Sequence, residues 1–105
     1  MIRIRILRNE KLYIDQYIID GHSKNEPSEM VCSGISAITQ TTALGLESLL
    51  KRKLKIQSAD GYLNVRLLSP ADEQTNLLTE TMMIGIRTID KKYPGNMVIT
   101  DIQRK

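Results

Sequence analysis

The sequence predicts an α+β fold, a single domain over residues 1–105 in which two long helices pack on one face of a mixed sheet. Five segments have the apolar alternation or the Ile, Val and Tyr content of strands, and two long segments repeat apolar residues with a helical period. Their order along the chain is ββαββαβ. With 41% hydrophobic residues and no Trp or Phe, the core must consist mainly of Ile, Leu, Val and Met.

The first two elements are predicted strands. Over residues 2–6 isoleucine alternates with arginine, which is typical of a strand with one buried face. Residues 12–19 are rich in Ile and Tyr and predict a second strand, paired with the first through a turn at 9–11. This second strand ends at Asp20-Gly21-His22.

A long helix is predicted after the polar segment 23–28. Pro27 disfavours helix at the residue before it, and Ser28 is a good N-cap. Apolar residues then follow a helical period as far as Lys51. A stripe of small residues runs beside the apolar face: Gly34, Thr41 and Gly45. We expect this stripe to let the helix lie close to the sheet.

The second half repeats the order of hairpin and helix. A strand around Leu54 and Ile56 and a strand over 62–67 are joined by Asp60-Gly61, a hairpin signal. Ser69-Pro70 then predicts a helix that begins with Ser69 as the cap and Pro70 as its first residue.

The end of the chain predicts one more strand. The second helix is expected to close at Lys91-Lys92, before Pro94-Gly95. The apolar residues at 97–102 then indicate the last strand of the sheet.

Charge and composition narrow the classes of function. The net charge of +3 is weak evidence for nucleic-acid binding. The basic run 51–55 is interpreted as a helix C-terminus, with a contact to RNA or another anionic partner as the alternative. No apolar run approaches the about 18 residues that a membrane span needs. We therefore expect a cytoplasmic protein without a membrane contact.

Cysteine and histidine content excludes two further classes. One Cys allows no disulfide within the chain, and one Cys with one His is too few for a self-contained zinc site. We expect neither a metal nor a cofactor.

His22 and Cys32 are the residues with the clearest chemical potential. His22 follows a strand, and Cys32 lies near the start of the first helix, so the short connection should bring them close together. The positive end of the helix dipole favours a thiolate, and a nearby imidazole can accept the thiol proton. Backbone N–H groups at the same helix end could bind an oxyanion. Placement alone leaves open the alternative that Cys32 is a small buried residue and His22 an ordinary turn residue.

Two segments around this pair resemble the ribosomal-processing cysteine protease family, Prp. They are Gly21-His22-Ser23 and the run from Glu29 to Ala37, Glu-Met-Val-Cys-Ser-Gly-Ile-Ser-Ala. The family pattern is Gly-His-Ala, a loop, then Asp-Ile-Val-Cys-Ala-Ala-Val-Ser-Ala. Chain length and element order also agree with that family.

The resemblance implies roles for individual residues. Cys32 matches the family's nucleophile and His22 its general base. Ser36, one helical turn after Cys32, matches a family serine that is either a hydrogen-bonding helper or a packed helix residue. Glu29 stands in the place of the family's acidic residue, where it would orient His22, bind substrate or only favour the helix dipole. The predicted substrate loop is Ser23, Lys24, Asn25, Glu26, Pro27 and Ser28.

The same resemblance implies a substrate and partners. Members of this family remove a short N-terminal extension from a large-subunit ribosomal protein, so that segment is the expected partner, with a homodimer and a ribosome contact. The loop between His22 and Cys32 is shorter than in the family and contains no Gly. A loop with Pro27 should be stiffer than a glycine-rich one, so we expect it to close differently over a peptide or to serve a different extension.

Two other functions compete with the protease. One is a non-catalytic module that binds the ribosome or RNA through the basic run and the sheet. The other is a different thiol chemistry, such as a thioesterase or a redox sensor. A redox cycle would need an external thiol, because the chain has no second Cys.

Overall fold

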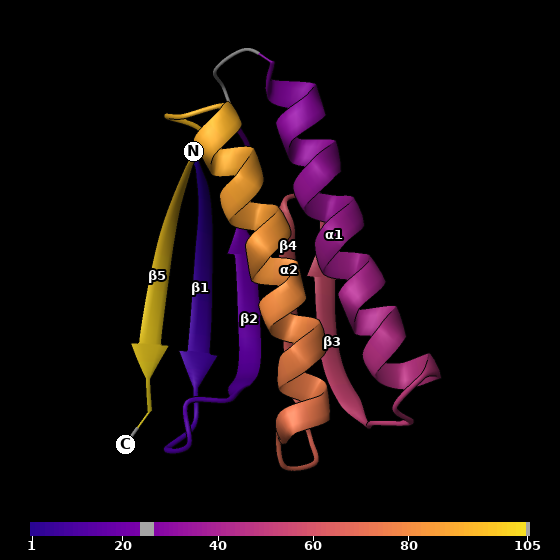
Figure 1. The fold of residues 1–105 in the computed structure, drawn as a ribbon. Helices are drawn as coiled ribbons and strands as arrows, with labels where there is room; N and C mark the ends of the chain where they lie inside the picture. Colours follow the sequence, from indigo (N-terminus) through magenta and orange to yellow (C-terminus); the bar gives the residue numbers. More distant parts are fainter. Residues whose placement is uncertain (24–26, 105) are drawn as a thin grey trace.

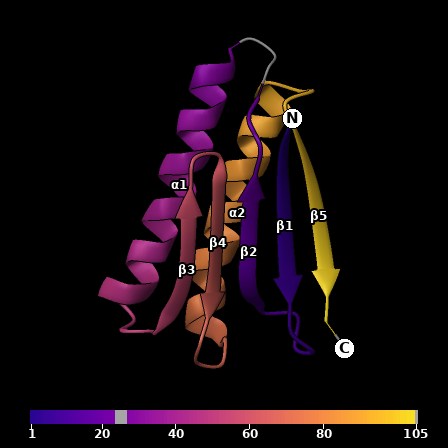
Figure 2. The ribbon, with the colours of Figure 1, turned by 180° about the vertical axis from the view of Figure 1, so that it is seen from behind.

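The computed structural model describes residues 1–23 and 27–104. The elements follow the predicted ββαββαβ order: β1 (Ile2–Arg8), β2 (Ile14–Asp20), α1 (Ser28–Ser48), β3 (Leu54–Ala59), β4 (Tyr62–Leu67), α2 (Glu73–Lys92) and β5 (Met97–Gln103). Both helices cover the same face of the sheet, which leaves the other face open (Figures 1 and 2). The predicted α+β class and architecture are confirmed.

The sheet is mixed because its last strand joins in parallel. The strand order is β3-β4-β2-β1-β5, with β5 parallel to β1 and the other pairs antiparallel. The isoleucines of β1 point toward the helices and are buried, as the alternation predicted. They form the core with side chains from β2, β4 and both helices: Tyr17, Ile19, Val31, Ile35, Val65, Met82, Met83 and Ile86.

Glycines let the two helices approach each other closely. A Cβ on Gly34 would lie 3.0 Å from Ile89 Cδ1, and one on Gly85 would lie 3.0 Å from Ile38 Cδ1. Gly45 also faces the other helix, but a Cβ there would make an ordinary contact of 3.5 Å with Leu78 Cδ1. The prediction that this small-residue stripe faces the sheet was therefore wrong, because its glycines contact the other helix.

Both helix starts differ from the prediction. Pro27 occupies the N-cap position of α1 and Ser28 is already helical, without a side-chain cap. The cap of α2 is Asp72 and not Ser69, because the Asp72 carboxylate accepts a 3.0 Å hydrogen bond from the Thr75 N–H while Thr75 Oγ accepts one from the Asp72 N–H. This reciprocal pair satisfies a free N–H of the helix, whereas the buried Ser69 hydroxyl has no hydrogen-bond partner among the described residues.

The basic run 51–55 does not form a helix C-terminus. Helix α1 ends at Ser48, and the run forms the connection to β3 and the first residues of that strand. Lys51 has a positive φ of 54°, which ends the helical path, and Arg52 forms a 2.8 Å ion pair with Asp72.

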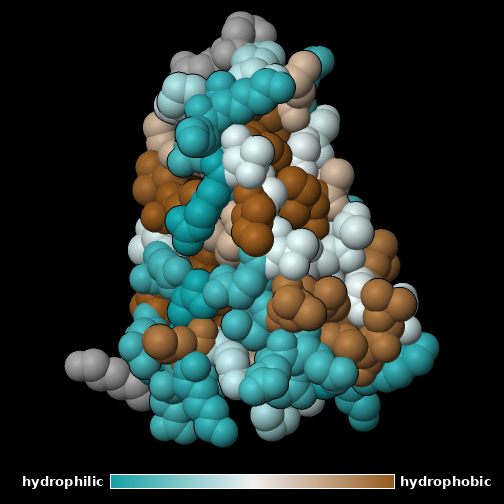
Figure 3. Space-filling model, viewed as in Figure 1, coloured by the Kyte–Doolittle hydropathy of each residue, from teal (hydrophilic) through white to brown (hydrophobic). Residues whose placement is uncertain are grey.

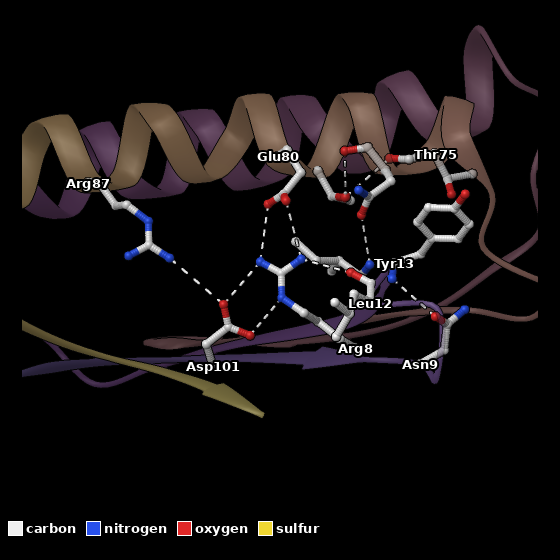
Figure 4. Close-up of polar contacts among 11 residues, drawn as sticks. Arg8, Asn9, Leu12, Tyr13, Thr75, Glu80, Arg87 and Asp101 are labelled. Atoms are coloured by element: carbon white, nitrogen blue, oxygen red, sulfur yellow. Dashed lines mark hydrogen bonds and ion pairs between the residues drawn. The ribbon is translucent and has the colours of Figure 1, made fainter. Parts of the chain in front are cut away.

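Arg8, at the end of β1, forms ion pairs with residues of β5 and α2 (Figure 4). Its guanidinium donates to Asp101 of β5 at 2.8 and 3.0 Å and to Glu80 of α2 at 3.2 Å. It also donates to the Leu12 carbonyl at 2.9 Å. The hydrogen bonds with Asp101 and, to a smaller extent, Glu80 raise the pKa of Arg8. Neither helix of the described chain has the length and apolarity to cross a membrane.

Candidate active site

His22 is positioned by the turn that ends β2. Gly21 has a φ of +95°, and a Cβ there would lie 2.4 Å from the Met1 carbonyl oxygen, so only glycine fits beside the start of β1. The His22 carbonyl accepts a 2.7 Å hydrogen bond from the Met1 amino group. The His22 side chain is exposed and its ring lies against Gly61, where a Cβ would be 2.4 Å from Nε2.

Cys32 is the fifth residue of α1 and is half-buried. Its sulfur accepts a hydrogen bond from the Ser23 backbone N–H, at 3.3 Å. The first intrahelical hydrogen bond runs from Val31 N to Pro27 O, so the N–H groups of residues 28–30 precede the bonded ladder. The thiol therefore lies one turn inside the positive end of the helix dipole.

His22 and Cys32 line the same cleft, which has a volume of about 530 Å³. It is lined by α1 from Cys32 to Gln40 and by the turn that joins β3 to β4. That turn lies at the end of the sheet where β2 also ends (Figures 1 and 2). Part of the cleft lining is apolar: Ile2, Ile19, Ile35 and Leu63. Its walls also carry polar side chains: Ser33, Ser36, Gln40, Ser58, Asp60 and Tyr62. The volume of this cleft and its apolar lining with added polar groups are typical of a binding site.

The structure brings the predicted pair into one cleft without a direct hydrogen bond between them. In the described chain, the bond on the Cys32 sulfur comes from Ser23 and not from the His22 ring. A catalytic pair often tightens only when substrate binds, so this geometry is compatible with proton transfer between them.

The other predicted site residues have different positions. Ser36 lines the cleft, and its hydroxyl accepts a 2.7 Å hydrogen bond from Gln40 Nε2. Glu29 is exposed in the first turn of α1, and it is not part of the cleft lining. Within the predicted loop Ser23 is buried and Pro27 and Ser28 are half-buried, while positions 24–26 lie outside the described residues.

A family model described as cysteine protease Prp matches residues 1–98, which include every predicted site residue. The chain belongs to the cysteine protease Prp family. It is therefore an enzyme, a cysteine protease, and the recognition made from the two motifs is confirmed.

Relatives within the Prp family are distant in sequence. The ribosomal processing cysteine protease Prp of Staphylococcus aureus, from strains Mu50 and NCTC 8325, is 25% identical over 101 residues. That match spans 92% of this chain and 95% of the relative.

Solved structures show that this chain shares its fold with proteins of low sequence identity. The S. aureus Prp structure with a substrate peptide has a TM-score of 0.88 and 23% identity, and covers 96% of this chain and 99% of that one. The one with a covalently linked product peptide has a TM-score of 0.85 and 24% identity over the same shares. SMU.848 from Streptococcus mutans has a TM-score of 0.87 and 22% identity, with 99% of each chain covered.

Sequence reasoning missed several residues around the Prp cleft. Asp60 and Gly61 were predicted as a hairpin turn, but nothing local shows that this turn lies against His22. The position of Asn96 behind Ser23 was missed for the same reason. Among the described residues, no group of three or more His, Cys, Asp or Glu side chains could hold a metal ion.

Proposed function

We propose that this Prp-family protease hydrolyses a peptide bond with Cys32 as the nucleophile and His22 as the general base. The observation that carries the proposal is that both side chains line one cleft, with Cys32 near the start of α1. The chain contains no other Cys or His, so the thiol and imidazole that such a protease uses can come only from these two residues.

The proposed reaction passes through an acyl-enzyme. His22 takes the proton of Cys32, and the thiolate attacks the scissile carbonyl carbon. Backbone N–H groups at the start of α1 donate to the oxyanion. The tetrahedral intermediate collapses to a thioester as His22 protonates the leaving amine, and His22 then deprotonates the water that releases the acyl product.

The accessory residues follow from the cleft. Ser36 lines the cleft, where its hydroxyl accepts a hydrogen bond from Gln40. We therefore assign to the Ser36 hydroxyl a hydrogen bond with the substrate or with a group near Cys32. Glu29 is exposed in the first helical turn, where a negative charge favours the helix dipole. Orientation of His22 by Glu29 stays a prediction.

The proposed substrate is the N-terminal extension of a large-subunit ribosomal protein. The name of the S. aureus relatives, ribosomal processing cysteine protease, supports this class of substrate. The residues 23–28 would cover the bound peptide and exclude water.

A peptide-cleavage assay tests the catalytic assignment. The full chain is incubated with a synthetic peptide that spans the junction between the extension and the mature ribosomal protein, and products are followed by mass spectrometry. We expect Cys32→Ala and Cys32→Ser to abolish cleavage, and His22→Ala to lower it by at least about 10²-fold. Ser48→Ala, at the exposed end of α1, is the control that should cleave normally. Full cleavage by Cys32→Ala would show that the assignment is wrong.

We propose that two copies associate through the helix-bearing face. Both helices carry large exposed apolar side chains, namely Leu44 on α1 and Leu77 and Ile84 on α2. Figure 3 shows apolar surface on this face of the molecule. A second copy would remove these side chains from water. Light scattering after size-exclusion chromatography tests this, because Leu77→Lys together with Ile84→Lys should convert a dimer to a monomer.

The open face of the sheet supports a ribosome contact in addition to catalysis. The strand register places Arg3, Arg5, Lys55 and Arg66 on the face away from the helices. Asp20 is the acidic residue that pairs with Arg3 there. Binding to ribosomal RNA that weakens steeply with salt, and weakens further in Lys55→Ala/Arg66→Ala, would support this contact.

A further inference from the structure

Asn96 is an almost fully buried polar residue, 2% exposed, in the turn between α2 and β5. Its side-chain Nδ2 donates a 2.9 Å hydrogen bond to the Tyr93 carbonyl, and its own carbonyl accepts one of 2.9 Å from Ile2 N. Its Oδ1 accepts a hydrogen bond from the Ser23 hydroxyl. These bonds fix Asn96 rigidly between the end of α2 and the start of β1, because a buried amide held on both sides cannot rotate without losing partners.

Ser23 connects Asn96 to the thiol. It is 7% exposed, its hydroxyl donates to Asn96, and its backbone N–H donates to Cys32 Sγ at 3.3 Å. An N–H aimed at a sulfur stabilises the thiolate more than the thiol, since a hydrogen bond to the charged form is the stronger one. The hydroxyl bond to Asn96 therefore restrains the same residue whose N–H donates to the thiol.

The same turn also supports the start of α1. The Tyr93 hydroxyl lies 3.1 Å from Met30 Sδ, so the end of α2 contacts the first turn of the helix that carries Cys32. Residues 93–96 thus lie behind both the Ser23 amide and the α1 start.

We propose that Asn96 is a positioning residue for the thiol: it holds Ser23 so that the Ser23 N–H stabilises the Cys32 thiolate and directs the sulfur into the cleft beside His22. The inference rests on the proposed function in one respect, because it takes Cys32 as the nucleophile. Asn96 itself is not among the residues that line the cleft.

The test measures Cys32 reactivity without any peptide. The rate of alkylation by iodoacetamide is followed against pH for wild type, Ser23→Ala, Asn96→Ala and the double variant. We expect each single variant to slow alkylation at neutral pH by about tenfold and to move the pH midpoint of the reaction upward. The double variant should be no slower than Asn96→Ala, because both substitutions remove the same hydrogen bond.

Asn64→Ala is the matched control. Asn64 is a β4 residue whose side chain accepts from Gln16 Nε2 at 2.9 Å and donates to Gln57 at 3.1 Å, on the sheet face away from Cys32. Its loss should lower the melting temperature without changing the alkylation profile. If Asn96→Ala does not fold, the alkylation profile of Ser23→Ala alone tests the proposal, since this substitution keeps the backbone N–H and removes only the hydroxyl.

Peptide kinetics provide the second readout. In Asn96→Ala kcat should fall while KM stays near the wild-type value, because Asn96 does not line the cleft and the substitution affects the thiol and not the peptide contacts. Wild-type alkylation profiles in Ser23→Ala and Asn96→Ala, with only a lower melting temperature, would overturn the proposal. If wild type cleaves no peptide, the proposed function fails, but the alkylation profiles still decide the role of Asn96.

Discussion

The direction of the His22 ring depends on a glycine that lies far away in the chain. Gly61 has a φ of +68°, which suits the Asp-Gly hairpin turn, and its missing side chain leaves the space that the imidazole occupies. The Gly61 carbonyl also accepts a 2.9 Å hydrogen bond from Gly21 N, so the hairpin is joined to the segment that carries His22. One residue thus serves both the turn and the proposed catalytic base.

Gly61→Asn separates these two roles. Asparagine tolerates a positive φ, so the turn should form, but its Cβ would lie 2.4 Å from His22 Nε2 and the ring must move. We expect kcat for peptide cleavage to fall by about 10²-fold, the effect of misplacing a catalytic group by about 1 Å. Circular dichroism checks that the fold is kept.

Gly45→Ala is the control for this substitution. Its added Cβ would meet Leu78 Cδ1 at 3.5 Å, an ordinary contact away from His22, so activity should not change. Wild-type kcat in Gly61→Asn would contradict the proposed role of Gly61.

The helices differ in how their ends are stabilised. Helix α2 has a capping box at Asp72 and Thr75 and two lysines in its last turn, all of which complement its dipole. Helix α1 has no side-chain cap, and only Glu29 adds a favourable charge to its first turn. Among the described residues, no side chain caps the start of α1, whose N–H groups the proposed mechanism assigns to the oxyanion.

The cap of α2 should make stability depend on pH. The Thr75 N–H and then the Arg52 guanidinium hold the pKa of Asp72 below its usual value in the folded protein. Its contribution is complete above the carboxyl pKa of the unfolded chain and is lost as the pH falls through the lower folded pKa. Urea denaturation at several pH values should show that the stability difference between wild type and Asp72→Asn narrows in acid.

Asp60→Asn, at the exposed turn between β3 and β4, is the matched control and should follow the wild-type pH dependence. A constant difference between wild type and Asp72→Asn down to about pH 2 would contradict the role of the ionised cap.

The last strand is connected to the rest of the fold at both ends. At one end Asn96 accepts from Ile2, and at the other Asp101 accepts from Arg8, which also reaches Glu80 on α2. The Arg8 side chain is only 15% exposed, so its charge is satisfied by these partners more than by water. Because β5 pairs only with β1, these contacts hold a parallel edge strand in place.

Arg8→Met tests this connection. It leaves Asp101 and Glu80 without their main cation, and we expect the free energy of unfolding to fall by about 1–3 kcal/mol. Arg3→Met removes a pair on the exposed sheet face, where Arg3 is 61% exposed, and should have little effect. Equal unfolding curves for the two variants would show that the Arg8 contacts do not stabilise the fold.

Local patterns along the chain were sufficient for the type and order of every strand and helix. They also predicted that His22 follows a strand and that Cys32 lies near a helix start, since alternation, helical period and turn residues depend on neighbours in the sequence. Boundaries were less accurate, because Ser69 and Asp72 are both good caps and only the Asp72–Thr75 pair forms. The family motif around the two residues supplied the protease class.

The arrangement around Cys32 came from contacts between distant segments. Pairing of β2 with β4 brings Gly61 to His22, and pairing of β1 with β5 brings Asn96 to Ser23. The packing of Gly34 and Gly45 on the second helix was mispredicted for the same reason. Strand order and helix contacts are chosen by burial over the entire core, so no local pattern encodes which turn lies behind the thiol.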